Sequence, residues 1–133
     1  MSSTHSSNPV SCSAGNATIK YIENHNLVEK TQKLSEIFFK KLNSLKDKFP
    51  DHISLINGKG LIAAIIFKDD KNSRPHVLAN LVCDLCLKKQ LLVCKTGREA
   101  IKLGPPLVIK KINLLKGLEI LEKAIEIGIK KLN

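Results

Sequence analysis

The polar residues that precede the first predicted helix are the residues of this sequence best suited to chemistry. Residues 3–8 are rich in hydroxyl groups and lead directly into Pro9, which suits the first helical position because no hydrogen bond is lost there. Asn8 suits the N-cap position before it. Free N–H groups, the positive end of the helix dipole and several hydroxyls would then lie together and bind an anion, phosphate above all. The alternative interpretation is an ordinary capped helix behind a frayed terminus.

The four cysteines, Cys12, Cys83, Cys86 and Cys94, are the other candidate reactive groups. Because no secretion signal is visible, we predict that they are reduced thiols. Cys83 and Cys86 form a C-x-x-C pair, a spacing found in zinc sites. A tetrahedral site needs four ligands, however, and only Cys94 follows at short range, with no paired histidines. We therefore predict no metal site and expect the pair to pack as small hydrophobic side chains of an amphipathic helix.

The net charge of +10 comes almost entirely from twenty lysines, against two arginines. Such a charge can indicate a nucleic-acid or membrane partner. The lysines are spread along every predicted helix, however, and aromatic residues make up only 4% of the chain, so no base-stacking platform is present. No apolar run approaches the ~20 residues that span a bilayer. We therefore expect no nucleic-acid partner, no membrane segment and a cytoplasmic location.

Apolar residues recur with helical or strand-like spacing along nearly all of the 133 residues, which predicts a single domain over residues 1–133. Helical spacing predicts four helices, over residues 8–23, 26–49, 76–89 and 111–132. Short apolar stretches bounded by glycine, proline or polar residues predict four strands, over residues 53–57, 61–67, 91–94 and 100–103. The order favours an α+β fold: a three- or four-stranded, mostly antiparallel sheet with helices packed on one face and a long C-terminal helix.

Local signals predict how these elements begin, connect and pack. Asn26 is expected to cap the second helix, with Glu29 three residues later completing a capping box. Gly58 and Gly60 predict a tight bend between antiparallel strands, and the continuous apolar run 61–67 predicts a buried strand after it. The first helix is expected to bury one apolar face, made of Val10, Ala14, Ala17, Ile19 and Ile22.

Three segments resemble, in the same order, motifs of the class III pyridoxal-phosphate transaminases, whose catalytic core has fold type I. S-T-H-x-S-N-P-x-x-C-x-A at residues 3–14 is similar to the family's loop-to-helix entry T-[HF]-x-G-N-P. N-G-K-G-L-I at 57–62 is similar to R-G-x-G-L-[MI], and I-K-L-G-P-P-L-V-I at 101–109 is similar to [IF]-R-[LF]-x-P-P-L-x-I. The resemblance implies that the chain is the family's C-terminal small domain, with residues 1–8 a loop from the large domain.

The resemblance also implies roles for particular residues. Thr4 corresponds to the threonine that reaches the cofactor phosphate of the other subunit of the dimer. Lys102 stands at the position of the arginine that holds the substrate carboxylate in many members, and Asn57 stands where another arginine is usual. Lysine is a point charge without the planar fork of arginine, so Arg98 becomes a possible substitute if the strand and turn direct it into the same cleft. The alternative for Lys102 is an edge-strand lysine that faces solvent.

The chemistry of this family needs a Schiff-base lysine and an aspartate on the pyridinium nitrogen, and by resemblance both lie upstream of Thr4. We therefore assign no catalytic residue and expect the chain to be inactive alone, with no cofactor bound. In the full enzyme we expect pyridoxal 5'-phosphate as the cofactor. The expected partners are the large pyridoxal-phosphate-binding domain, a homodimer partner, and amino donor and keto acceptor substrates. A stand-alone basic binding module and a self-assembly domain are the competing hypotheses.

Overall fold

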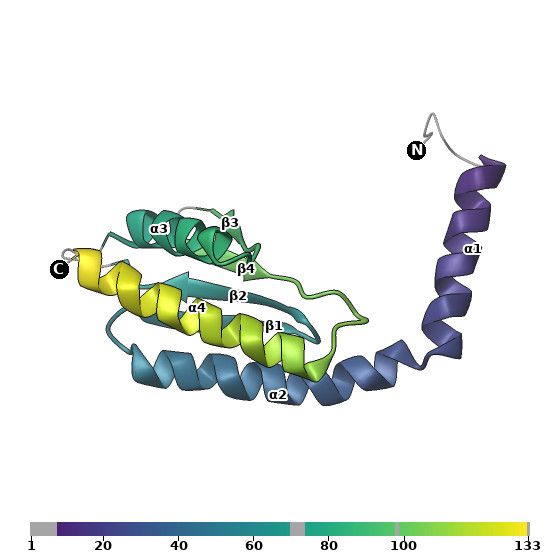
Figure 1. Ribbon diagram of the computed structural model, residues 1–133, viewed down its shortest axis with the longest axis horizontal. Helices are drawn as coiled ribbons and strands as arrows, with labels where there is room; N and C mark the ends of the chain where they lie inside the picture. Colours follow the sequence, from purple (N-terminus) through teal and green to yellow (C-terminus); the bar gives the residue numbers. More distant parts are fainter. Residues whose placement is uncertain (1–7, 70–73, 98, 133) are drawn as a thin grey trace.

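Three helices cover one face of a four-stranded antiparallel sheet in the computed structural model, which describes residues 8–69, 74–97 and 99–132 (Figure 1). The strands lie in the order β1-β2-β4-β3, and every neighbouring pair is antiparallel. The predicted α+β fold with a long C-terminal helix is confirmed. Along the chain the elements are α1 (Pro9–Asn24), α2 (Leu27–Lys48), β1 (Ile53–Lys59), β2 (Ile62–Phe67), α3 (Pro75–Lys88), β3 (Cys94–Thr96), β4 (Ala100–Leu103) and α4 (Lys111–Leu132).

The core lies between the sheet and the layer formed by α2, α3 and α4. Alternate strand residues point into it: Ala63, Ile65 and Phe67 of β2 are at most 2% exposed, whereas Ile62 is 60% exposed. The strand predicted to be buried over 61–67 is therefore buried on one side only, because helices cover a single face of the sheet. The helices contribute the largest share of the core, which includes Phe38, Leu42, Leu45, Leu78, Val82, Cys86, Leu114, Leu121 and Ile125.

Helix α1 extends away from this body and, among the helices and strands, meets only α2 (Figure 1). None of its residues is buried, and Val10 and Ile19 are 78% and 56% exposed. The prediction of a buried apolar face on this helix is therefore wrong. Among the described helices and strands α1 has only α2 as a neighbour, so most of that face has nothing to pack against.

The predicted capping box at Asn26 is also wrong. Asn26 adopts the left-handed conformation (φ 48°, ψ 44°), and its side chain makes no capping hydrogen bond. Only two residues join α1 to α2, and their N–H groups donate to carbonyls of α1, His25 to Tyr21 and Asn26 to Glu23. Asn26 nevertheless stands at the N-cap of α2: its N–H belongs to the end of α1, whereas its carbonyl oxygen accepts a hydrogen bond from the N–H of Lys30 (3.1 Å), and its backbone takes the left-handed conformation that asparagine tolerates.

The third strand is shifted from its predicted position. Residues 91–93 are irregular, and β3 covers Cys94–Thr96. Leu91 and Val93 are half-buried and pack against the core instead of pairing with a strand. By contrast β4 matches its predicted range, 100–103, and stops just before the segment that contains Pro105 and Pro106.

Candidate functional site

The sheet has one face that no helix covers, which we call the open face. Residues directly opposite one another in antiparallel strands point to the same side, so the register of the strands defines its members. They are Leu55, Asn57 and Lys59 of β1, Ile62, Ala64 and Ile66 of β2, Ala100 and Lys102 of β4, and Cys94 and Thr96 of β3. The open face thus combines exposed apolar residues, such as Leu55 and Ile62, with two lysines.

Lys102 lies in the interior of the sheet, on the open face. Strand β4 runs between β2 and β3, and Lys102 is opposite Ala64 on one side and Cys94 on the other. Its neighbours Ile101 and Leu103 point into the core. The side chain is exposed, as the alternative interpretation expected, but the prediction of an edge-strand position is wrong because β4 has a partner on each side.

The other residues assigned roles by resemblance are not placed by the structure. Thr4 and Arg98 both lie outside the described residues. The start of α1 is described from Asn8 onward and confirms the predicted N-cap, because the Asn8 Oδ1 accepts hydrogen bonds from the N–H groups of Val10 (2.9 Å) and Ser11 (3.5 Å). Two of the N–H groups expected to be free for an anion are therefore already occupied by Asn8.

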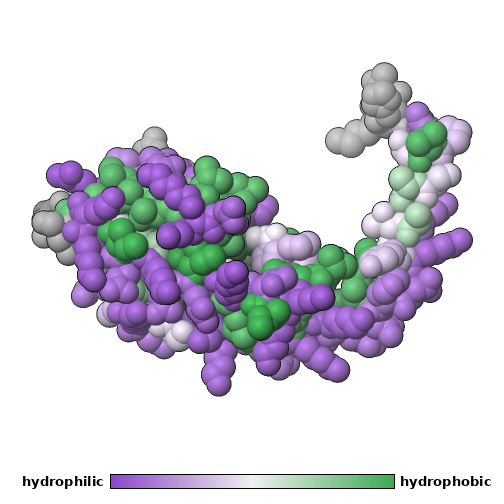
Figure 2. Space-filling model, in the orientation of Figure 1, coloured by the Kyte–Doolittle hydropathy of each residue, from purple (hydrophilic) through white to green (hydrophobic). Residues whose placement is uncertain are grey.

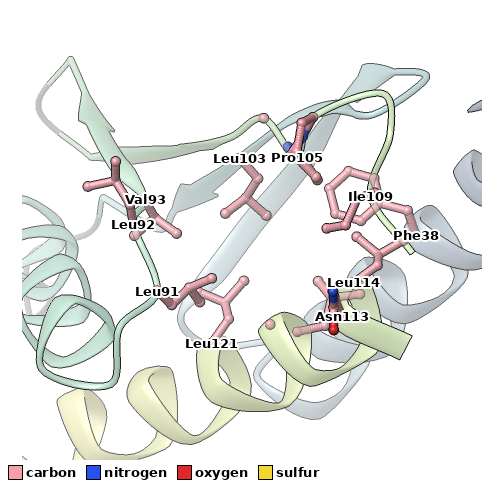
Figure 3. A pocket seen from close by; sticks show the side chains of 14 residues that line it. Phe38, Leu91, Leu92, Val93, Leu103, Pro105, Ile109, Asn113, Leu114 and Leu121 are labelled. Atoms are coloured by element: carbon pink, nitrogen blue, oxygen red, sulfur yellow. The ribbon is translucent and has the colours of Figure 1, made fainter. Parts of the chain in front are cut away.

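A cavity of about 320 Å³ opens on the helix side of the sheet, away from the open face (Figure 3). Its walls come from the strand exit at Leu103–Pro106, from residues 91–93, from α2 and from α4, and Asn113 is its only side chain with a hydrogen-bonding group. No local pattern in the sequence predicts this cavity. Its lining residues come from separate segments, and each segment taken alone has the pattern of ordinary core.

Of the four cysteines only Cys94 belongs to the open face, and no group of three potential metal ligands occurs among the described residues. Cys86 is fully buried, and burial raises the pKa of its thiol to about 12. Burial also raises the pKa of Cys83, with smaller contributions from Asp84 and Cys94. The prediction that the C-x-x-C pair packs within the helix is confirmed, with Cys86 buried and Cys83 half-buried, whereas Cys12 and Cys94 are exposed.

This arrangement predicts a clear order of cysteine reactivity. At pH 8 iodoacetamide should modify Cys12 and Cys94 and leave Cys86 unmodified, because the thiolate is the reactive form. The raised pKa of Cys86 also means that its neutral thiol stabilises the fold fully below pH 9.0, and that this contribution is lost as the pH rises from 9.0 toward about 12. Mass spectrometry of alkylated peptides, with and without urea, measures the order. Equal modification of Cys86 and Cys94 in the native protein would contradict it.

Comparison with known proteins decides the family. The profile of the aminotransferase class-III family matches residues 1–125, which is most of the chain. The chain belongs to the class III aminotransferases.

Similar class III aminotransferases are much longer than this chain. The ornithine aminotransferase of Emericella nidulans is 32% identical over 123 residues, which are 92% of this chain and 26% of that protein. The acetylornithine aminotransferase of Lactococcus lactis is 37% identical over 121 residues, 91% of this chain and 30% of that protein. The crystal structure of acetylornithine aminotransferase from Elizabethkingia anophelis superposes with a TM-score of 0.83 at 32% identity, over 95% of this chain and 30% of that one. The chain therefore spans about a quarter to a third of the length of these relatives.

Class III aminotransferases use pyridoxal phosphate, which raises the question of whether the residues described here form a site for it. No lysine among residues 8–69, 74–97 and 99–132 is buried, so none has the enclosed position that a cofactor-bearing lysine needs. The N–H groups of Val10 and Ser11 at the start of α1 are taken by Asn8. The described residues alone therefore do not fit the cofactor. In the same part of the chain no helix is long and apolar enough to cross a membrane.

Proposed function

We propose that this chain is the C-terminal small domain of a class III aminotransferase and acts by docking on a pyridoxal-phosphate-binding large domain. In this proposal residues 1–133 form one domain, and residues 1–8 are a loop that belongs with the large domain. The observation that carries the proposal is helix α1. Helix α1 stands clear of the body and has no buried residue. The chain nevertheless superposes over 95% of its length on a relative, and the superposed part is only 30% of that longer polypeptide.

The exposed surface supports the same proposal. The chain exposes 9422 Å², whereas a compact monomer of 14.7 kDa exposes about 6900 Å². The difference is of the size that obligate interfaces bury. Figure 2 shows a hollow between α1 and the body. At the corner between α1 and α2 a groove of about 400 Å³ is lined by Tyr21, His25, Leu27, Lys30, Lys33, Leu34, Leu107, Val108 and Ile109. We assign the large domain to this hollow and to the open face.

Within the assembled enzyme three residues of this chain would contact the reactants. Thr4 would bind the phosphate of pyridoxal 5'-phosphate in the neighbouring subunit of a homodimer. Lys102 would bind an anionic group of the substrate, the amino donor or keto acceptor, and Arg98 would assist if its side chain reaches the same cleft. When bound, the cofactor supplies the electron sink that transamination requires. This chain supplies substrate binding and a cover that excludes water, and the lysine that carries the cofactor belongs to the large domain.

A chimera tests this proposal. The matching segment of the Elizabethkingia anophelis acetylornithine aminotransferase is replaced by this chain, and transamination of acetylornithine is measured. We expect turnover, and we expect Lys102→Arg to raise kcat/KM about 10-fold because a guanidinium grips a carboxylate through two parallel hydrogen bonds. Lys95→Arg, on the neighbouring strand, is the matched control and should change nothing. A folded, dimeric chimera that is inactive with either residue at position 102 would refute the proposal.

The assembled enzyme is expected to be cytoplasmic and to have neither a nucleic-acid nor a membrane partner. Hydrophilic residues are spread over the side of the molecule seen in Figure 2 rather than gathered in one patch, which supports this expectation. Some of its lysines are already paired. Lys48 contacts both Glu122 and Glu126 across α2 and α4, and Lys130 contacts Glu126 at 2.9 Å.

A further inference from the structure

The cavity of about 320 Å³ on the helix side of the sheet is separate from the substrate contacts proposed above. Leu103 lines it and, as the neighbour of Lys102 along β4, points to the opposite side of the sheet. The labelled side chains of Figure 3 surround a common space and come from α2, β4, α4 and the loops beside them. The cavity therefore needs an occupant of its own.

One wall of the cavity contains Gly117, in the interior of α4. Glycine is a poor residue for a helix interior. A Cβ at Gly117 would lie 3.4 Å from Leu91 Cδ1, a contact that a small side chain can make, so packing does not require glycine here. At Gly128 of the same helix, by contrast, a Cβ would lie 2.9 Å from Leu78 Cδ1 of α3. Gly117 therefore weakens α4 at a point where its missing side chain leaves space in the cavity.

The lining of the cavity selects for an uncharged and mainly apolar ligand. No aspartate, glutamate, lysine, arginine or histidine is among the described residues that line it, so a charge buried there would have no ionic partner. An apolar cavity of about 150 Å³ holds benzene. A space of about 320 Å³ therefore accommodates two fused rings.

Asn113 adds one hydrogen-bonding group to this apolar lining. It lies in the first turn of α4, is exposed, and its side chain makes no hydrogen bond with another described residue. Its amide can both donate and accept. A ligand with a single N–H or O–H group therefore finds one partner in the cavity, and a ligand with several polar groups leaves the others unpaired.

We propose that this cavity binds a small, uncharged aromatic compound of about two fused rings with one N–H or O–H group. The rings pack on the apolar side chains of α4 and of the strand exit at Leu103–Pro106, and the polar group bonds to the Asn113 amide. The choice of a free compound over a segment of the large domain rests on the proposed function, which places that domain in the hollow beside α1 and on the open face.

Indole is the probe, because it has two fused rings, one N–H group and no charge. The intact chain contains no tryptophan, so the fluorescence anisotropy of indole reports binding directly. We expect saturable binding of indole. We expect 1-methylindole, which lacks the N–H donor, to bind about 5-fold more weakly, as the loss of one hydrogen bond predicts.

Two variants place the ligand in the cavity. Gly117→Leu should weaken indole binding about 10-fold or more, because the leucine and the ligand compete for the same space, while the urea midpoint of unfolding does not fall. Gly15→Leu is its matched control, in a helix away from the cavity with nothing within 4 Å of the Cβ position. Asn113→Ala should weaken binding about 5-fold, and Asn16→Ala, an exposed asparagine of α1, should bind as the unchanged chain does.

Each other outcome overturns the proposal or a stated part of it. Absence of saturable binding, or equal binding by Gly117→Leu and Gly15→Leu, refutes the cavity as the site. If Asn113→Ala binds like Asn16→Ala, or 1-methylindole like indole, the assigned ligand class is wrong. If the chain binds indole but the folded chimera does not, the large domain fills the cavity and a free ligand is refuted, while turnover by the chimera separately decides the proposed function. Should Gly117→Leu fail to fold, the Asn113 pair and 1-methylindole still give the decision.

Discussion

Gly58→Ala is expected to disrupt the hairpin of β1 and β2 and to lower the free energy of unfolding by about 3 kcal/mol or more. Gly58 has φ of +151°, a conformation that L side chains rarely adopt. A Cβ there would lie 2.1 Å from the carbonyl oxygen of Ile62 and 2.7 Å from the Cα of Ala63. Both atoms belong to backbone that pairs with β1, opposite Lys59 and Gly58, so neither can move aside without breaking the register.

Gly97→Ala provides the matched control for this prediction. Gly97 also has a positive φ, 63°, but nothing lies within 4 Å of the position of its Cβ. Its replacement should therefore cost only the backbone penalty of about 1 kcal/mol. Urea unfolding followed by circular dichroism measures both variants. If Gly58→Ala proves no more destabilising than Gly97→Ala, the close approach of the two strands at Gly58 is wrong.

Phe38→Ala is expected to lower the free energy of unfolding by about 4 kcal/mol. Phe38 is 1% exposed, lies edge-on to Phe39 with ring centroids 5.6 Å apart, and forms part of the wall of the 320 Å³ cavity (Figure 3). Truncation removes a large apolar side chain from the core and enlarges a space that is already present. The other lining residues come from β4, from α4 and from two separate loops, so they cannot all collapse into the gap.

Val28→Ala tests whether this effect comes from burial. Val28 lies on the same helix, α2, but is 72% exposed, so its truncation should change stability by no more than about 0.5 kcal/mol. Thermal and urea unfolding of the two variants give the comparison. Similar losses for Phe38→Ala and Val28→Ala would show that the core does not lie where the structure places it.

The helices and the two long strands could be predicted because their signals are local. Apolar periodicity locates α2, α3 and α4 to within one residue at each end, and Asn8 with Pro9 marks the start of α1. Prediction failed where local signals conflict with tertiary context. Asn26 stands at the N-cap of α2 as its residue type indicates, but in the tight link to α1 its backbone is left-handed and its side chain makes no capping hydrogen bond. Leu91 and Val93 have the spacing of a strand, but packing against the core takes them out of the sheet.

The candidate site could be predicted as separate residues but not as an arrangement. Lys102 and Asn57 each depart from a family motif, and each departure is visible in the sequence alone. Their meeting across Ala64 depends on β2 pairing with β4, which lies beyond the whole of α3 and β3 along the chain. No local pattern encodes which strands become neighbours, and the cavity beside Asn113 is hidden for the same reason.

The isolation of α1 has a consequence for the order of assembly. A lone helix of 16 residues is marginal in water, and Gly15 near its centre weakens it by about 1 kcal/mol. The body, in contrast, has a contiguous core to which α1 contributes nothing. The body can therefore fold without α1, whereas in the proposed assembly α1 would be stabilised only when the large domain packs against it. Maturation of the complex would then proceed outward from the sheet, with the amino-terminal arm captured last.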